Sequence, residues 1–297
     1  MSATEIPRVF RPDEVFVGRD YGGAEYEVTP DLIERYIAGT GDDNPWYRGP
    51  SPFGGPVAPA LIVHSAVFHS HSWYLPNIYG NLHARQEFDF LAPVMVGERL
   101  RSRSVIVDRY EKRDREYVVN ETLIFDAGGR LVTRGRTHQS FLIPERAAGG
   151  FAVDKSRERD STRAFKVGER GGEPIESPAI RVDQAMCMAF SGPALNYHTD
   201  RAAALKLGFP EIVVQGMLSV CIAGAMMTRR FGAGFLCGGR FDLRLVNVLW
   251  AGESTAAHGR ILERRREGAR SRAEVEVWCE KSDGTRTVVG SASALEL

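Results

Sequence analysis

The order of hydrophobic and polar positions divides the chain into two halves that carry the same elements in the same sequence. Each half begins with a short amphipathic helix. The first is expected to start at Thr29-Pro30 and the second behind the capping residue Asp183. Their apolar faces carry Leu32, Ile33, Tyr36 and Ile37 in one half, and Met186, Cys187 and Phe190 in the other.

A glycine-led turn and a nearly continuous apolar run follow in each half. These are GGPVAPALIVHSAVF and GFPEIVVQGMLSVCIAGAMM, a pattern typical of a helix that is buried on all sides. Strands come next: FDFLAPVMVGERLRSRSVIV and FDLRLVNVLWAGESTAAHGRI each predict two strands around a turn at Gly97 or Gly252. Both halves end in segments of period two, so the repeated unit is a buried helix wrapped by an antiparallel sheet.

A polar, glycine-rich stretch separates the halves. Residues 146–178 are rich in Gly, Arg, Asp and Ser and show almost no apolar periodicity, which indicates a linker. We therefore expect an N-terminal domain over residues 1–145, a linker over 146–175 and a C-terminal domain over 176–297. The fold class predicted is α+β, with two helix-in-antiparallel-sheet units fused in one chain.

Composition narrows the range of partners. The 297 residues are 43% hydrophobic, and Lys+Arg and Asp+Glu both total 38, so no overall positive field attracts nucleic acid or an anionic membrane. Neither a signal-peptide core nor a membrane-length apolar run is found, and we expect a cytoplasmic protein. The four cysteines form no CxxC pair, which favours buried thiols over disulfides or a zinc site.

Motifs in both halves resemble those of one family. Thr40-Gly41-Asp42-Asp43-Asn44-Pro45-Trp46-Tyr47 is similar to the Ser/Thr-Gly-Asp-x-Asn-Pro-x-His fingerprint of the MaoC-like, or R-specific enoyl-CoA hydratase 2, family, with Tyr47 in place of histidine. The second half keeps Ser191-Gly192 and His198-Thr199-Asp200, but has Pro193 in place of aspartate and Asn196 displaced by one position. Val214-Gln215-Gly216-Met217 resembles the start of that family's central helix, with glutamine for histidine.

The resemblance implies a double hot-dog fold and lyase chemistry, the reversible addition of water to an enoyl thioester. It implies an N-terminal domain of FAS1-like dehydratase type that is non-catalytic, and a substrate carried by coenzyme A or an acyl carrier protein. No cofactor is implied. The acyl chain, the carrier, the direction of reaction and the oligomeric state stay open, with a homodimer as one option.

The same resemblance assigns roles to residues of the second half. Hydration needs a group that exchanges protons with water and C2, and a donor that stabilises enolate oxygen. His198 is the candidate acid/base, Asn196 orients the water or the thioester carbonyl, and the Gly216 amide is the oxyanion donor. Near its usual pKa of about 6.5, the imidazole of His198 is expected to control the pH dependence of the rate.

Other residues are secondary candidates. Asp42, Asn44 and Tyr47 keep motif positions, although they can equally serve only to tie down their own loop. Substrate-binding candidates are Gln215, Arg229 and Arg230, the two arginines facing coenzyme A phosphates or simply solvent. His64, His69 and His71 have spacings that suit one helical face poorly, so no metal site is expected.

Two other functions fit the same sequence. Because Pro193 replaces the family aspartate, the protein can be an accessory hot-dog subunit that binds a thioester or a polyketide-like ligand without catalysis. Thioester hydrolysis on this fold is the third option, and it requires water to be held at the carbonyl carbon instead of C3.

Overall fold

A single antiparallel sheet organises the molecule. The computed structural model describes residues 15–65, 82–143 and 165–297. The sheet has eleven strands in the order β1-β3-β4-β5-β2-β8-β11-β10-β9-β6, with β7 also paired to β9. Their bounds are β1 Glu25–Glu27, β2 Leu82–Phe90, β3 Arg99–Lys112, β4 Arg115–Asp126, β5 Leu131–Leu142, β6 Glu173–Glu176, β7 Ile180–Arg181, β8 Arg240–Leu245, β9 Ser254–Glu267, β10 Arg270–Lys281 and β11 Arg286–Glu296.

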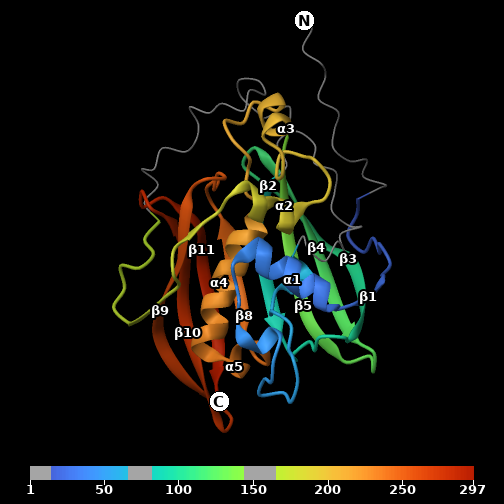
Figure 1. Ribbon diagram of the computed structural model, residues 1–297, viewed down its shortest axis with the longest axis vertical. Helices are drawn as coiled ribbons and strands as arrows, with labels where there is room; N and C mark the ends of the chain where they lie inside the picture. Colours follow the sequence, from blue (N-terminus) through green and yellow to red (C-terminus); the bar gives the residue numbers. More distant parts are fainter. Residues whose placement is uncertain (1–14, 66–81, 144–164) are drawn as a thin grey trace, which may run out of the picture.

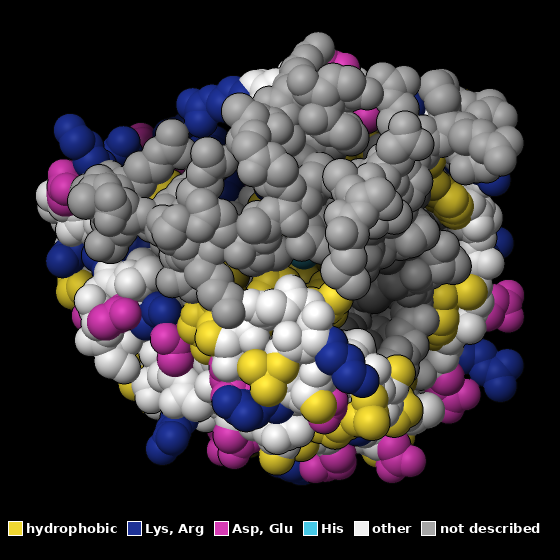
Figure 2. Space-filling view, turned by 90° about the horizontal axis from the view of Figure 1, so that it is seen from above, with side chains coloured by type: hydrophobic (Ala, Val, Ile, Leu, Met, Phe, Trp, Pro, Cys, Tyr) yellow, Lys and Arg dark blue, Asp and Glu magenta, His cyan; other side chains and the backbone are white. Residues whose placement is uncertain are grey.

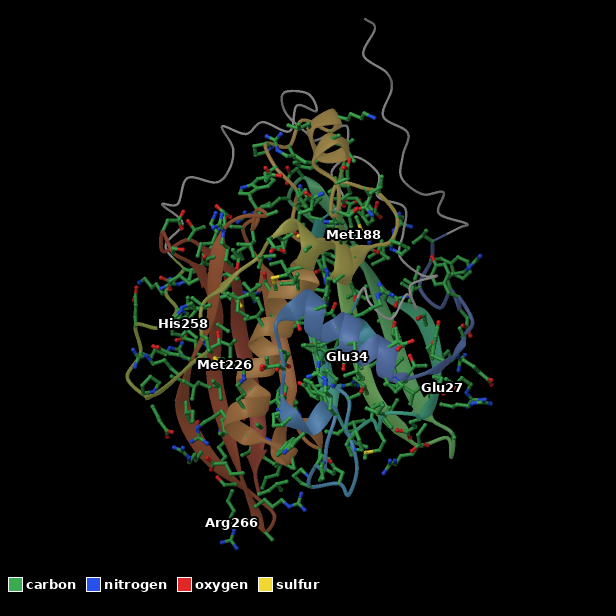
Figure 3. All side chains as sticks on the ribbon, in the orientation of Figure 1. Glu27, Glu34, Met188, Met226, His258 and Arg266 are labelled. Atoms are coloured by element: carbon green, nitrogen blue, oxygen red, sulfur yellow. The ribbon has the colours of Figure 1, made fainter. Side chains whose placement is uncertain are left out.

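Helices α1, α2, α4 and α5 form a layer on one side of this sheet, and α3 lies at the top end of the molecule (Figure 1). Their bounds are α1 Pro30–Thr40, α2 Gln184–Ser191, α3 Arg201–Lys206, α4 Gly216–Phe231 and α5 Ala233–Leu236, with short 3-10 turns η1 Pro45–Tyr47 and η2 Ile62–His64. Helix α4 packs on β9, β10 and β11. Met188 on α2 and Met226 on α4 both lie in this layer (Figure 3).

The two halves repeat one plan, as the sequence predicts. β3 and β9 both have 14 residues, β4 and β10 both have 12, and the turns before β3 and β9 place Gly97 and Gly252 at φ of 89° and 92°. The continuous sheet and the paired units confirm the predicted double hot-dog arrangement. The two halves meet where β2 pairs with β8, with Phe88 opposite Phe241.

The two leading helices pack directly against each other. The side chain of Thr29 caps α1 and that of Asp183 caps α2, at the positions expected from the sequence. The guanidinium of Arg35 on α1 donates to the carbonyl oxygens of Ala189 and Gly192 at the end of α2, at 3.4 and 3.2 Å. Close approach requires Gly39, because a Cβ there would lie 2.9 Å from the Cβ of Phe190.

The predicted linker and the predicted first central helix fall partly outside the described residues. Residues 173–175, the last of the linker predicted over 146–175, already belong to β6 on the edge of β9. Within GGPVAPALIVHSAVF, where a helix is predicted, the described residues form only the 3-10 turn η2, which ends at an extended Ser65; the prediction from residue 66 on, with His69 and His71, lies outside the described residues. Within the described part of the chain, no helix is long and apolar enough to cross a membrane.

Gly39→Ala tests the contact between α1 and α2. Alanine raises helix propensity, but its methyl group collides with Phe190, so we expect a net loss of about 1–3 kcal/mol in the free energy of unfolding. Urea denaturation measures it. Gly171→Ala is the control, since a Cβ there has no neighbour within 4 Å. Equal effects of the two substitutions would contradict this account of the helix pair.

Candidate active site

His198 is held at the start of the central helix of the second half. Its Nδ1 lies 2.7 Å from the carbonyl oxygen of Val213, and the backbone N–H of Val213 donates to the carbonyl of Tyr197 at 3.0 Å. A carbonyl only accepts hydrogen bonds, so Nδ1 carries the proton and Nε2 keeps its lone pair. Burial lowers the pKa of His198 to about 4, partly opposed by the Val213 carbonyl.

Asn196 shapes the loop that presents this histidine. Its Oδ1 accepts the backbone N–H of His198 at 2.7 Å, and its Nδ2 donates to the carbonyl of Ala194 at 3.2 Å. The hydroxyl of Thr199 also donates to Ala194 at 2.8 Å. Asn196 therefore acts first as a positioning residue in a local turn.

Equivalent hydrogen bonds align the motifs of the two halves. The N–H of Val57 donates to the carbonyl of Trp46, just as that of Val213 donates to Tyr197. Val57 also pairs with Met95 as Val213 does with Trp250. In this alignment Tyr47 corresponds to His198. Asp42 corresponds to Pro193, and Ala60 corresponds to Gly216. Helix α3 occupies the segment DRAAALKLGF that the first half lacks.

Gly216 and Gln215 begin the second half's central helix. As the first residue of α4, Gly216 has an N–H that no carbonyl of an earlier helical turn accepts. A Cβ at Gly216 would lie 2.0 Å from a methyl of Leu245, so a larger residue there would force the Leu245 side chain to move. Oε1 of Gln215 is buried and has no hydrogen-bond partner among the described residues.

In the first half, the motif residues form a closed polar pair. The hydroxyl of Tyr47 donates to Oδ2 of Asp42 at 2.5 Å, and both residues are buried. Arg229 of α4 places Nη2 3.5 Å from Oδ1 of Asp42. Burial raises the pKa of Asp42, opposed by the Tyr47 hydroxyl and by Arg229. Asn44 caps η1 by accepting the N–H of Trp46 at 3.0 Å.

Two further buried groups beside this pair are absent from the site residues predicted from the sequence. Tyr36 of α1 lies close to Cys221 of α4, and burial raises the pKa of Tyr36 well above its usual value. Burial also raises the pKa of Cys221 to about 12, so its thiol stays protonated and is not a nucleophile at neutral pH. The helical spacing of Tyr36 is the signal that places it on the buried face of α1.

The two candidate arginines, Arg229 and Arg230, both contact acidic side chains of the protein itself. Arg230 pairs with Glu173 of β6 at 2.8 Å, and its guanidinium lies 4.9 Å from the ring centroid of Phe231. Figure 2 shows Lys and Arg side chains interspersed with Asp and Glu on the described surface of the face seen from above. Across the described residues, no group of three His, Cys, Asp or Glu is placed to hold a metal ion.

Comparisons with known proteins agree with this geometry. Residues 15–134 match the family described as "FAS1-like, dehydratase domain region". A putative MaoC domain protein dehydratase from Chloroflexus aurantiacus has 15% identity and a TM-score of 0.71, and the match covers 99% of both chains. A MaoC-like dehydratase from Phytophthora capsici has 16% identity and a TM-score of 0.68, covering 97% of this chain and 98% of that one.

A third similar structure is described by its fold. It is a conserved hypothetical protein from Mycobacterium tuberculosis with a double hotdog fold, at 15% identity, a TM-score of 0.62, and coverage of 96% and 97%. No functionally curated protein matches the sequence. The family match and the structures together confirm the predicted resemblance to MaoC-like double hot-dog proteins.

Tyr47→Phe tests the buried pair. It leaves Asp42 without its hydroxyl donor, and we expect a loss of about 1–3 kcal/mol in the free energy of unfolding at neutral pH. Because the folded-state pKa of Asp42 is already raised and rises further in the variant, the loss should shrink as pH falls and the carboxyl protonates. Urea denaturation at neutral and mildly acidic pH measures it.

A double-mutant cycle supplies the control. In an Asp42→Asn background the carboxylate is absent, so the cost of Tyr47→Phe should be smaller and independent of pH. A cost that is the same in both backgrounds and at both pH values would contradict the pairing.

Proposed function

We propose that this MaoC-like double hot-dog protein catalyses the reversible hydration of an enoyl thioester, with the active site in its C-terminal half. The dehydratase family match of the first half and the double hot-dog fold support this class of chemistry. The observation that carries the proposal is the imidazole of His198, fixed through Nδ1 to Val213, three residues before the amide of Gly216.

The arrangement provides both proton positions and charge stabilisation. His198 Nε2 takes a proton from water as the water oxygen bonds to C3 of the enoyl thioester. The C2–C3 π electrons move toward the carbonyl oxygen, which the Gly216 N–H and the start of α4 stabilise as enolate. The imidazolium then returns its proton to C2, leaving the hydrated product and a neutral His198. Dehydration follows the same steps in reverse.

Other residues support this site. Asn196 fixes the backbone of His198, and the remaining hydrogen-bonding capacity of its amide orients the water or carbonyl. The buried Oε1 of Gln215 is an acceptor at the same helix start. Arg229 and Arg230 contribute positive charge for coenzyme A phosphates. The closed Asp42–Tyr47 pair makes the first half a non-catalytic partner, with Asn44 serving its own turn.

His198→Ala should lower turnover of enoyl thioesters by about 10²–10⁴-fold, as expected for loss of a general acid/base. The rate is measured by following both the double bond and free thiol, so that hydrolysis is distinguished from hydration. Asp42→Asn is the matched control in the other half and should reduce turnover much less. The reverse ranking would assign the active site to the first half.

The pH dependence of turnover follows from the same residue. Since the pKa of His198 is lowered to about 4, the imidazole remains an unprotonated base from neutral pH down to mildly acidic pH. The rate should therefore stay flat through pH 6.5 and fall only as His198 protonates near its lowered pKa. Circular dichroism at each pH controls for unfolding. A fall centred near 6.5 would show a solvated imidazole instead.

Pro193 favours a second candidate, the non-catalytic accessory protein. It occupies the position that Asp42 occupies in the first half, and a proline side chain can neither accept nor donate a proton. Pro193→Asp restores the family carboxylate five residues before His198. If the wild type turns over no thioester and only this variant is active, the accessory function replaces the proposed one.

A further inference from the structure

The inner face of the first half's sheet is lined with uncharged polar side chains. On β2, Gln86 alternates with the core residues Phe88 and Phe90, so it points toward the helical layer. The cross-strand neighbours of Gln86 on this face are Thr137 of β5 and then Asn120 of β4. A second row runs from Phe88 through Gly135 and Thr122 to Ser104; Gln86, Ser104, Asn120, Thr122 and Thr137 are at most 5% exposed.

In the second half, the corresponding face of the sheet carries apolar core residues. β4 and β10 have the same length and both follow a hairpin, which makes Val275 the counterpart of Asn120 and Val277 that of Thr122. In the same way Ala292 of β11 corresponds to Thr137. One row of cross-strand neighbours runs through both halves. In the second half it consists of Gly259, Val277, Gly290 and Leu243, and in the first half it continues through Gln86, Thr137 and Asn120. Polar side chains therefore begin in this row at the junction of the halves.

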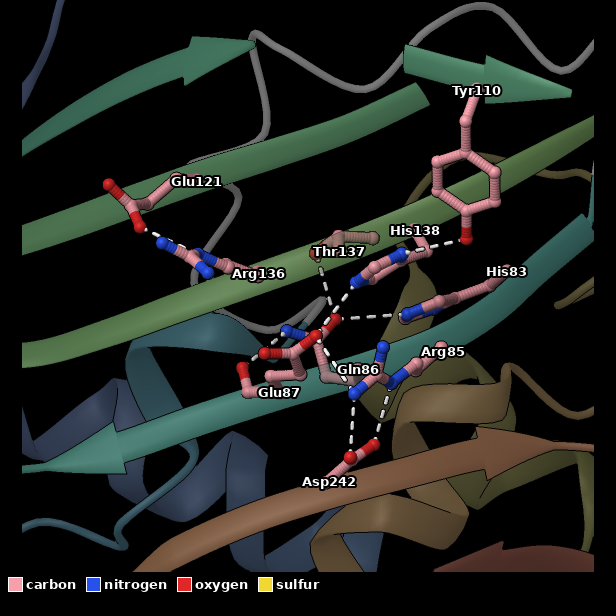
Figure 4. A network of polar contacts seen from close by, with 10 residues as sticks. All are labelled: His83, Arg85, Gln86, Glu87, Tyr110, Glu121, Arg136, Thr137, His138 and Asp242. Carbon is pink, nitrogen blue, oxygen red and sulfur yellow. Dashed lines mark hydrogen bonds and ion pairs between the residues drawn. The ribbon is translucent and has the colours of Figure 1, made fainter. Parts of the chain in front are cut away.

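The hydrogen bonds on this face leave one buried N–H donor, Nδ2 of Asn120, unpaired among the described residues. The hydroxyl of Thr122 donates to Oδ1 of Asn120 at 3.1 Å, so the hydroxyl of Ser104, 3.0 Å from that of Thr122, supplies the proton between them. Nδ2 of Asn120 is buried, and it has no hydrogen-bond partner among the residues the structure describes. Thr137 donates to Oε1 of Gln86 at 2.8 Å (Figure 4).

Such a group is costly if it serves the fold alone. A buried donor without a partner lowers stability by about 1–3 kcal/mol, and valine at the equivalent position of the second half avoids this loss. The relay from Ser104 through Thr122 fixes the orientation of the Asn120 amide. It thereby holds the Nδ2 protons ready for an acceptor oxygen that the described residues do not supply.

The position of this donor indicates which part of a substrate it meets. Gly216 lies over Leu245 of β8, and Asn120 is on β4, three strands away in the sheet order. Three strand spacings amount to about 14 Å. A thioester carbonyl at Gly216 therefore places the far part of the acyl chain, and not C3, over the polar rows.

We propose that the polar inner face of the first half selects an acyl group with an uncharged oxygen, a hydroxyl or keto group, toward its far end. Asn120 Nδ2 donates to that oxygen, and Thr137 and Gln86 supply the polar surroundings. The rows contain no Lys, Arg, Asp or Glu at their described positions, which disfavours a carboxylate. The inference rests on the proposed thioester function and names its substrate class.

Binding measurements test it without requiring turnover. Isothermal titration calorimetry compares dodecanoyl-CoA, a dodecanoyl-CoA hydroxylated near the end of its chain, and the analogue with a terminal carboxylate. The wild type should bind the hydroxylated thioester about tenfold more tightly than the other two, the gain expected for one satisfied hydrogen bond. Equal affinities for the alkyl and hydroxylated thioesters overturn the proposal, whether or not the protein hydrates enoyl thioesters.

The double variant Asn120→Val, Thr122→Val uses the residues that the second half itself carries. We expect it to lose the preference for the hydroxylated thioester while its melting temperature stays the same or rises. Thr287→Val is the control, because it removes a buried threonine hydroxyl in the second half, bonded to the Cys279 carbonyl at 3.4 Å. It should keep the preference. A destabilised double variant that still prefers the hydroxylated thioester shows that the rows serve the fold alone.

If no enoyl thioester is hydrated but the preference for the hydroxylated thioester and its loss in the double variant are both observed, the proposed function fails and the binding inference stands. The binding inference and the proposed function can therefore be contradicted independently of each other.

Discussion

The pairing of β2 with β8 is the interaction on which the molecule depends. It joins two sheets into one and sets the register in which Phe88 faces Phe241 and Gln86 faces Leu243. A bidentate pair between Arg85 and Asp242, with both contacts at 2.6 Å, reinforces this seam (Figure 4). Because helices of both halves then cover one shared sheet, α1 can reach α2 and α4, and groups from both halves meet in one core.

The two halves carry different groups at the aligned motif positions. Asp42 stands in the first half where the second half has Pro193, and His198 stands in the second half where the first half has Tyr47. Their surroundings differ, because Asp42 accepts a hydrogen bond from Tyr47 and lies near Arg229 of α4, whereas His198 hydrogen-bonds the carbonyl of Val213, three residues before α4 begins. A motif aligned only by sequence cannot show this difference, since the direction of a side chain depends on the helix it packs against.

Sequence patterns predict the repeated elements well because each has a strong local signal. The caps Thr29 and Asp183, the apolar run of α4 and the hairpin turns are visible in the amino-acid order. The site is predicted less completely. The lowered pKa of His198 arises from burial, which a hydrogen bond to a carbonyl fifteen residues away in the chain only partly opposes, and the unused donor of Asn120 depends on a hydroxyl relay between β3 and β4. Neither contact leaves a signature at its own position in the sequence.

The polar rows also divide the hydrophobic stabilisation of the fold unequally between the halves, since burial of apolar side chains is the main favourable contribution to folding. The alternate, core-facing positions of β10 and β11 are valine, alanine, cysteine and glycine, whereas those of β4 and β5 include asparagine and threonine. The described strands of the first half therefore contribute less apolar surface to the common core than those of the second half.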